Sequence, residues 1–402
     1  MRSRPVVGTI AGSDSGGGAG LQADLRTFTS LGTFGVTVVT SVTAQNTVGV
    51  SAIYPLPPSF VEAQLKAVLD DFDVRFMKTG VLPTAEVVEV VRRKVLESRV
   101  GLVLDPVMVA KSGDRLAGND VLEALKNLAK TSLIITPNLA ELELLTGSKI
   151  DDLNTLEEAA ALLSSQLGTN VLAKGGERLK GEDVVVIDGR INHLRGTVAE
   201  TKDTHGSGDV LSAAITSLLA RGRKLHEAVR EAKEFTTMSI TSGMRIGKGR
   251  GPVDPFANVE RLAEREKARE ELEELVLKLE ERKELIVALL KTEDKANLGY
   301  MTPYSEVATL AGGIIRYMGW IKVDGPIVFG VQNLVSTALR RTGSRLGLST
   351  SLTEKLLRNS EKYGLTIKES GQPCDVLLEG DKVVVLAQSS RELLDKLEVL
   401  AR

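Results

Sequence analysis

The heptapeptide Asp203-Thr204-His205-Gly206-Ser207-Gly208-Asp209 stands directly before the apolar run VLSAAI at residues 210–215. Glycine has no Cβ, so the backbone at Gly206 and Gly208 can approach a ligand closely. The apolar run predicts a buried helix, whose first N–H groups lack partners within the helix and can bind an anion. A carboxylate at the mouth of such a cradle, here Asp209, suits phosphoryl transfer to a hydroxyl group. The alternative is an aspartate that only caps the helix.

The sequence around this heptapeptide alternates short β-branched runs with longer helical patterns. Apolar periodicity predicts helices at 21–31, 59–70, 85–96 and from 139 onward. Runs of Val, Ile and Leu predict strands at 6–10, 36–40, 101–104, 133–135, 171–174 and 184–187. This alternation is typical of an α/β fold in which a mostly parallel sheet is flanked by helices. Ligands of such sheets bind beyond the carboxyl ends of the strands.

Length and composition narrow the class of protein. A chain of 402 residues predicts two domains. The net charge of −2 provides no basic field, so we expect no nucleic-acid partner. The single cysteine, Cys374, excludes an internal disulfide and a multi-cysteine zinc site, and it suits a cytoplasmic protein. No run approaches the roughly 18–20 apolar residues of a membrane-spanning helix, and the apolar run at 6–10 is too short for a signal peptide.

Further candidate residues follow other predicted strands. The glycine-rich segment 12–20 has neither Walker A nor dinucleotide-binding spacing, and is either a close-approach loop or a flexible surface loop. Asp105 after the strand at 101–104 is a candidate magnesium ligand. Asn138 and Glu141 either form a capping box or face a metal–phosphate complex. Lys174 at a strand end is a candidate partner for a nucleotide phosphate.

Taken together, several segments resemble one family. They are AGSDSGGGAGLQAD at 11–24, VTAQNT at 42–47, MKTG at 77–80, DPVM at 105–108, TPNLAE at 136–141, KGG at 174–176 and the heptapeptide at 203–209. They resemble the hydroxymethylpyrimidine/phosphomethylpyrimidine kinases of thiamine biosynthesis, members of the ribokinase-like superfamily. The resemblance covers about residues 5–257, so we expect a ribokinase-like kinase domain at 1–257 and a second, smaller α/β domain at 258–402.

The resemblance implies two successive ATP-dependent phosphorylations, first of 4-amino-5-hydroxymethyl-2-methylpyrimidine and then of its monophosphate. Carried over by motif, Asp105 and Glu141 would organise Mg²⁺, and Asn138 and Lys174 would face ATP. The anion hole with the catalytic residue would be Gly206, Ser207, Gly208 and Asp209. The pyrimidine would lie among Gly12, Ala19, Asp24, Gln45, Gly80, Val81 and Val107. Kinases of this family are often homodimers, so we expect a homodimer here.

The chain departs from the family at the anion hole. The family usually carries Gly-Thr-Gly-Cys, whereas this chain has Gly206-Ser207-Gly208-Asp209. An aspartate at the last of these positions is usual in ribokinase-type sugar kinases. Position 81 is Val, where the family usually has Met. The aspartate favours a carboxylate base, and it keeps a pyridoxal or pyridoxine kinase with a regulatory C-terminal domain as the alternative. The full glycine motif and the TAQNT segment at 43–47 favour the pyrimidine.

The composition changes after residue 257. Residues 260–291 are rich in Glu, Lys, Arg and Leu, and apolar residues repeat at helical spacing at 272, 275, 276 and 279 and again at 285, 286, 289 and 290. We therefore expect one long charged helix over 258–291 that packs on a small α/β unit at 292–402. The predicted strands of that unit are 327–330 and 382–386, and the predicted helices are 331–340, 353–362 and 391–401.

The second domain resembles the thiamine-phosphate synthase domain that is fused to this kinase in archaea and some thermophilic bacteria. The similar segments are SEVATLAGGIIR at 305–316 and GPIVFG at 325–330. By resemblance, Gly325, Gly330 and a helix start at Val331 could hold a phosphate, assisted by Arg316. The arginine- and acid-bearing stretch and the Lys-Glu-Pro segment of that family are missing. Two interpretations therefore stay open: a synthase that adds a thiazole phosphate, or a ligand-binding or regulatory module without catalysis.

Overall fold

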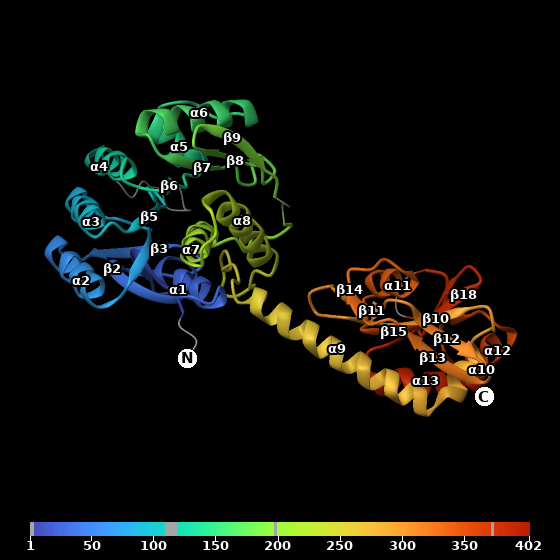
Figure 1. Cartoon of the computed structure of the whole chain (residues 1–402). Helices are drawn as coiled ribbons and strands as arrows, with labels where there is room; N and C mark the ends of the chain where they lie inside the picture. The colour runs from blue at the N-terminus through green and yellow to red at the C-terminus, as the bar shows by residue number, and fades with distance from the viewer. Residues whose placement is uncertain (1–3, 109–118, 197–198, 371–373) are drawn as a thin grey trace. The chain divides into compact units, whose positions relative to one another are not determined.

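The computed structural model describes residues 4–108, 119–196, 199–370 and 374–402 (Figure 1). It divides into two compact units, Met1–Asn258 and Val259–Arg402. Each unit has its own sheet and its own hydrophobic core.

The first unit alternates strands with helices along the chain. Its strands are β1 (Val6–Asp14), β2 (Phe34–Gln45), β3 (Val50–Pro55), β4 (Val74–Thr79), β5 (Gly101–Leu104), β6 (Ile134–Ile135), β7 (Asn170–Lys174), β8 (Asp183–Ile187) and β9 (Arg190–Leu194). Its helices are α1 (Gly20–Ser30), α2 (Pro58–Asp71), α3 (Ala85–Ser98), α4 (Asn119–Ala129), α5 (Leu139–Thr146), α6 (Leu153–Leu167), α7 (Ser207–Ala220) and α8 (Leu225–Thr241).

The strands of the first unit form one sheet in the order β3-β2-β1-β4-β5-β6-β7-β8-β9. The strands from β2 to β7 in this order pair in parallel, whereas β3, β8 and β9 pair antiparallel at the two edges. The predicted fold class, a mostly parallel sheet flanked by helices, is therefore confirmed. The carboxyl ends of the parallel strands meet at one edge of the sheet, where ligands of such folds bind.

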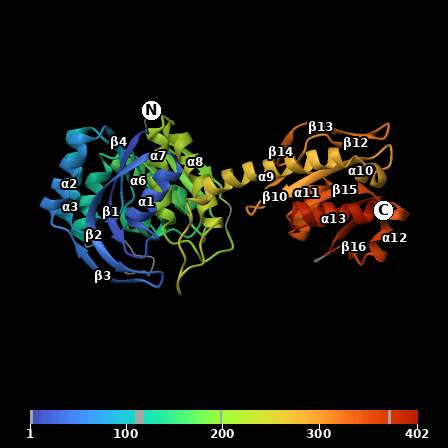
Figure 2. The same ribbon diagram turned by 90° about the horizontal axis from the view of Figure 1, so that it is seen from below.

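Alternating residues of the strands face two separate apolar layers. Leu104 and Val171 pack in a core with helices α2, α3, α4 and α6, whereas Val103 and Leu172 pack in a core with α1, α7 and α8. Figure 2 shows β1 and β2 between α2 and α3 on one side and α1 and α7 on the other. Burial on both faces explains why the central strands read as continuous apolar runs.

Strands β1 and β2 are longer than the strands predicted at 6–10 and 36–40. β1 continues from Ile10 to Asp14, pairing with β2 as far as Thr43, with a change of register between Ala11 and Gly12. Part of the predicted glycine-rich loop is therefore strand. The β2–β3 hairpin was not predicted, because the residues of β3 are all exposed and show no apolar alternation.

The second unit contains all but the first two residues of α9 (Ala257–Glu281), together with α10 (Lys283–Leu289), α11 (Leu334–Thr342), α12 (Glu354–Lys362) and α13 (Ser390–Ala401). Its strands are β10 (Lys295–Met301), β11 (Val307–Leu310), β12 (Gly313–Tyr317), β13 (Trp320–Asp324), β14 (Ile327–Phe329), β15 (Leu346–Ser351), β16 (Ile367–Lys368), β17 (Val376–Glu379) and β18 (Lys382–Ala387). The main path of its sheet is β13-β12-β10-β15-β18-β17-β16, and β11 and β14 branch from β10. Pairing is antiparallel except between β16 and β17.

The expected long helix is two helices in the structure. α9 ends at Glu281, Arg282 leaves the helical region with φ −112° and ψ 40°, and α10 begins at Lys283. The apolar stripe is interrupted by Arg282 and Lys283, so no core contact holds a straight helix there. Both helices supply residues to one core, among them Leu275 and Ile286. Within the described ranges, no helix combines the length and apolarity that crossing a bilayer needs.

Candidate active site

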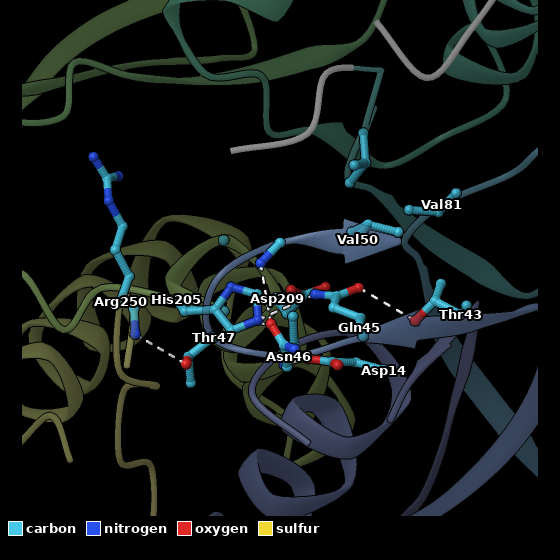
Figure 3. Close-up of a pocket in the computed structure, with 18 of the residues that line it drawn as sticks. Asp14, Thr43, Gln45, Asn46, Thr47, Val50, Val81, His205, Asp209 and Arg250 are labelled. Atoms are coloured by element: carbon cyan, nitrogen blue, oxygen red, sulfur yellow. Dashed lines mark hydrogen bonds and ion pairs between the residues drawn. The ribbon is translucent and has the colours of Figure 1, made fainter. Parts of the chain in front are cut away.

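A cavity of about 640 Å³ lies in the first unit, at the carboxyl edge of its parallel strands. Most of the predicted kinase-site residues line it, although they come from widely separated parts of the sequence. These are Gly12, Ala19, Gln45, Val81, Asp105, Val107, Asn138, Glu141, Lys174, Gly206, Gly208 and Asp209. Figure 3 shows several of the lining side chains around the cavity. Their roles in binding and catalysis remain predictions.

The start of α7 forms one wall of the cavity. Gly206 caps the helix with φ +80°, and a Cβ there would lie 2.0 Å from the carbonyl oxygen of Gly18. Only glycine combines this backbone conformation with so close a contact. Gly208 and Asp209 follow in the first turn, where backbone N–H groups have no partner inside the helix. This end of the helix can therefore bind an anion beside a carboxylate.

A lysine at the end of β7 and a carboxylate just after β5 lie against this turn. Nζ of Lys174 is 3.2 Å from Oδ1 of Asp105. A Cβ on Gly208 would be 3.4 Å from the same nitrogen and 3.6 Å from Oδ2 of Asp105. Burial lowers the pKa of Lys174, but Asp105 and Glu141 outweigh this and raise it. Lys174 therefore keeps its positive charge beside the N-terminus of α7.

Asn138 and Glu141 form the predicted capping box at the start of α5. Oδ1 of Asn138 accepts a hydrogen bond from the Glu141 N–H at 3.0 Å, and Oε2 of Glu141 accepts one from the Asn138 N–H at 2.8 Å. Burial raises the pKa of Glu141 to about 7, which Lys174 opposes and Asp105 reinforces. Capping and a binding role are compatible, since both residues also line the cavity.

The glycine-rich loop is organised around Asp14, which the sequence analysis did not single out. Its carboxylate accepts hydrogen bonds from the backbone N–H groups of Gly16, Gly18 and Ala19 at 2.8–2.9 Å. Burial raises the pKa of Asp14, but the hydrogen bond from His205 and those from the loop lower it overall. The sequence feature that could have identified Asp14 is its position within a glycine-rich segment.

His205 joins this loop to the predicted pyrimidine-binding side. Its Nε2 lies 3.1 Å from Oδ2 of Asp14 and 3.2 Å from the side-chain nitrogen of Gln45. Figure 3 shows the three side chains converging beside Asp209. His205 directly precedes Gly206, so the same residue links the loop to the anion-binding turn.

Three predicted residues do not line the cavity. Asp24 is fully buried and accepts hydrogen bonds from Thr9 and Lys78. Gly80 is buried too and donates its N–H to the carbonyl of Ile10. Ser207 is the first residue of α7. Lys78 received no role from the sequence, because its partners are 54 and 131 residues away. A lysine within a buried strand was the only signal.

Known proteins with a similar sequence decide the family. The family model for phosphomethylpyrimidine kinase matches residues 14–254. The chain belongs to the phosphomethylpyrimidine kinase family. A hydroxymethylpyrimidine/phosphomethylpyrimidine kinase of Haemophilus influenzae is 44% identical over 265 residues, which are 64% of this chain and 98% of that protein. The first unit is therefore a phosphotransferase, and we call it the kinase unit.

Two solved structures resemble the kinase unit. The phosphomethylpyrimidine kinase of Clostridium difficile has a TM-score of 0.53 and 37% identity, with 59% of this chain and 100% of that one covered. An ADP complex of Bacillus subtilis pyridoxal kinase has a TM-score of 0.60 and 34% identity, with 64% and 99% covered. Both pyrimidine and pyridoxal kinases therefore share this fold.

The mouth of the cavity carries cations that the sequence analysis did not select. Lys202, Lys248 and Arg250 line it, and none forms an ion pair within the described ranges. The segment with Lys248 and Arg250 is attached to the β2–β3 hairpin, since the Arg250 N–H donates to the carbonyl of Thr47 at 3.0 Å. Figure 3 shows this contact and the Arg250 side chain that extends from it. Cations beside a phosphate-transfer site can hold a phosphorylated ligand.

The candidate phosphate site of the second unit is not assembled as expected. α11 begins at Leu334 and is capped by Asn333, so its start lies beyond the predicted Val331. Arg316 donates to the carbonyls of Val287 and Leu290 at the end of α10. Gly325 and Gly330 have positive φ angles on either side of β14, as turns there require. Their proposed ligand role remains a prediction.

Proposed function

We propose that the kinase unit phosphorylates 4-amino-5-hydroxymethyl-2-methylpyrimidine with ATP and then phosphorylates the monophosphate. One observation carries the proposal: a single cavity contains the N-terminal turn of α7, the Asp209 carboxylate and Gln45. The family match supports a pyrimidine substrate. The kinase relatives that have been solved with ADP support a nucleotide as phosphoryl donor.

In this mechanism, Asp209 accepts the proton of the substrate hydroxyl as the phosphoryl group arrives. The N–H groups of the turn at Gly206, Ser207 and Gly208 stabilise the charge on that group. Gln45 binds the edge of the pyrimidine, with Gly12, Ala19, Val81 and Val107 around it. Asp24 and Gly80 lie behind this wall and support it without contacting the substrate. Asn138 and Lys174 bind the nucleotide, Lys174 as a charged donor to phosphate.

Magnesium fits the residues present. Asp105 and Glu141 offer carboxylate oxygens, which magnesium prefers, and Lys174 only partly balances their two charges. Glu141 already accepts backbone hydrogen bonds, including one from Met108, so coordination through water suits it better than direct contact. When bound, Mg²⁺ would neutralise charge on the transferred group.

A pyridoxal or pyridoxine kinase is the second candidate, since solved pyridoxal kinases resemble the kinase unit at least as closely in structure. A substrate panel separates the two. The full-length chain is given ATP and magnesium with hydroxymethylpyrimidine, its monophosphate, pyridoxal or ribose. The proposal expects the highest kcat/KM for the two pyrimidines. A higher kcat/KM for pyridoxal overturns it.

The base is tested with Asp209→Asn, which keeps the shape of the side chain. We expect turnover to fall by about 100-fold or more, since a positioned general base contributes that much. Substrate affinity should stay close to the wild-type value, because the pyrimidine contacts are untouched. Wild-type turnover in Asp209→Asn contradicts the assignment.

For the second unit we propose one of two roles. It either joins the pyrimidine diphosphate to a thiazole phosphate and releases pyrophosphate, or it binds a metabolite of the same pathway without catalysis. Both precursors are added to the full-length chain, and thiamine phosphate is measured. Product formation supports the synthase. Binding of a precursor without product, measured by calorimetry, supports the module.

A further inference from the structure

Lys78 is a fully buried charge near the candidate active site. It lies on β4 and none of its side chain is exposed. Its ammonium is 2.9 Å from Oδ1 of Asp24 and 3.2 Å from Oδ1 of Asp209. Burial lowers the pKa of Lys78, but Asp24 and Asp209 overcome this effect and raise it. The buried lysine is therefore a permanent cation beneath the cavity.

The two carboxylates around this cation differ in surroundings. Asp24 is enclosed, and its second oxygen accepts a hydrogen bond from the hydroxyl of Thr9 at 2.6 Å. The Asp209 side chain keeps 16% of its surface exposed and lines the cavity. Within the described ranges, only one oxygen of Asp209 has a hydrogen-bond partner, and that partner is Lys78. Lys78 thus holds Asp209 from below, while the rest of the carboxylate faces the cavity.

We propose that Lys78 is a positioning residue for phosphoryl transfer: it fixes the Asp209 carboxylate in the orientation that accepts the proton of the substrate hydroxyl. The inference rests on the proposed role of Asp209 as the base. An ion pair at low exposure restricts the rotation of a carboxylate more than a solvated contact does. The competing explanation is that Lys78 only balances the buried charge of Asp24.

A double-mutant cycle separates these explanations. Removing Lys78 alone would also take the charged partner away from buried Asp24, so all variants carry Asp24→Asn, which keeps a hydrogen-bonding group for Thr9. In this background the full-length chain is prepared with Lys78→Met, with Asp209→Asn and with both. The thermal midpoint of each variant reports folding. The values of kcat and KM for hydroxymethylpyrimidine report function.

If Lys78 acts through Asp209, the two substitutions are not additive. Lys78→Met should lower kcat by about 10-fold or more while Asp209 is present, because the base loses its orientation. In the Asp209→Asn variant, the same change should alter kcat by less than about 2-fold, since no base remains to be oriented. KM should change little in either case, because Lys78 does not line the cavity.

Other outcomes overturn the inference in distinguishable ways. Equal losses of kcat on Lys78→Met with and without Asp209 show that the lysine acts independently of the base. Unchanged kcat on Lys78→Met while Asp209 is present shows that Lys78 serves only as the charge partner of Asp24. Unchanged kcat on Asp209→Asn in the wild-type background overturns the proposed base itself, and with it the inference. Lys78→Arg serves as the conservative variant and should recover part of the lost kcat.

Discussion

Nε2 of His205 lies 3.1 Å from Oδ2 of Asp14, although 191 residues separate them in the sequence. That oxygen also accepts the N–H groups of Gly18 and Ala19. Gly18 is pressed against the imidazole, since a Cβ there would be 2.3 Å from Cδ2 of His205. The contact therefore fixes the glycine-rich loop against the residue that precedes the anion-binding turn.

His205→Phe tests this contact by keeping a ring and removing the hydrogen bond to Asp14. We expect KM for hydroxymethylpyrimidine to rise by about 10-fold or more, since a hydrogen bond to a charged group contributes about 1.5–3 kcal/mol. The reason is that the Asp14 carboxylate loses the hydrogen bond that Nε2–H of His205 donates, while the ring still fills the space beside Gln45. His193→Phe is the matched control, because His193 pairs with Glu157 on the surface. Equal KM values for wild type and His205→Phe contradict the prediction.

The two glycines of the turn make a second pair of contrasting variants. Gly206→Ala forces a positive φ on alanine and places Cβ 2.0 Å from the carbonyl oxygen of Gly18. We therefore expect a lower thermal midpoint as well as lost activity. Gly208→Ala meets only ordinary contacts, at 3.4 Å from Lys174 and 3.6 Å from Asp105. It should fold like the wild type but lose about 10-fold or more in kcat, because its methyl group occupies space meant for a phosphoryl group.

Thermal melts and kcat measured on both variants check this expectation. Wild-type kcat in a folded Gly208→Ala variant argues against a phosphoryl group beside Lys174 and Asp105. A wild-type thermal midpoint in Gly206→Ala argues against the described turn.

The sequence was sufficient for the positions of most strand-end residues, because each follows an apolar run whose carboxyl end must lie at one edge of a parallel sheet. Asp105, Asn138 and Lys174 were found in this way. The contacts of Lys78 with Asp24 and Asp209 were not predicted, since they form only when α1, β4 and α7 pack together. The break between α9 and α10 was also missed, because the apolar repeat resumes at Leu285 after the short interruption by Arg282 and Lys283.

Glu141→Gln separates the charge of this residue from its capping role. Glutamine can also complete a capping box, so α5 should stay intact. The magnesium concentration for half-maximal activity should rise by about 10-fold or more, as is typical when a partner beyond the direct ligands is lost. Glu143→Gln on the same helix is the control, since Glu143 accepts the N–H of Ile150 outside the cavity. A magnesium requirement equal to that of the wild type rules out Glu141 as part of the ion site.

Arg250→Ala probes the cations at the cavity mouth. The backbone bond from residue 250 to Thr47 should persist, so the hairpin contact is kept. We expect KM for the monophosphate to rise by about 10-fold, because one charge-assisted hydrogen bond to phosphate is lost. KM for the unphosphorylated alcohol should not change. Arg245→Ala, outside the cavity lining, is the control. Parallel increases for both substrates would show that Arg250 does not recognise the phosphate.

The pKa of Asp24 gives the stability of the kinase unit a definite dependence on pH. Burial raises this pKa from 3.8 to about 7; Lys78 opposes the shift and Asp209 adds to it. The folded state therefore holds the Asp24 proton more tightly than the unfolded state does. This contribution to stability is complete below about pH 3.8 and is lost as the pH rises to about 7.

Asp24→Asn removes the titration and keeps the side-chain shape. The thermal midpoint of the transition that ADP shifts is measured for both proteins between pH 4.5 and 7.5. Relative to Asp24→Asn, the wild type should lose stability as the pH rises through this window, because only the wild type releases the Asp24 proton there. Slopes are compared instead of absolute midpoints, since the substitution also changes the hydrogen bonds to Thr9 and Lys78. Parallel pH profiles would mean that Asp24 stays ionised in the folded kinase unit across this range, with Lys78 outweighing the effect of burial.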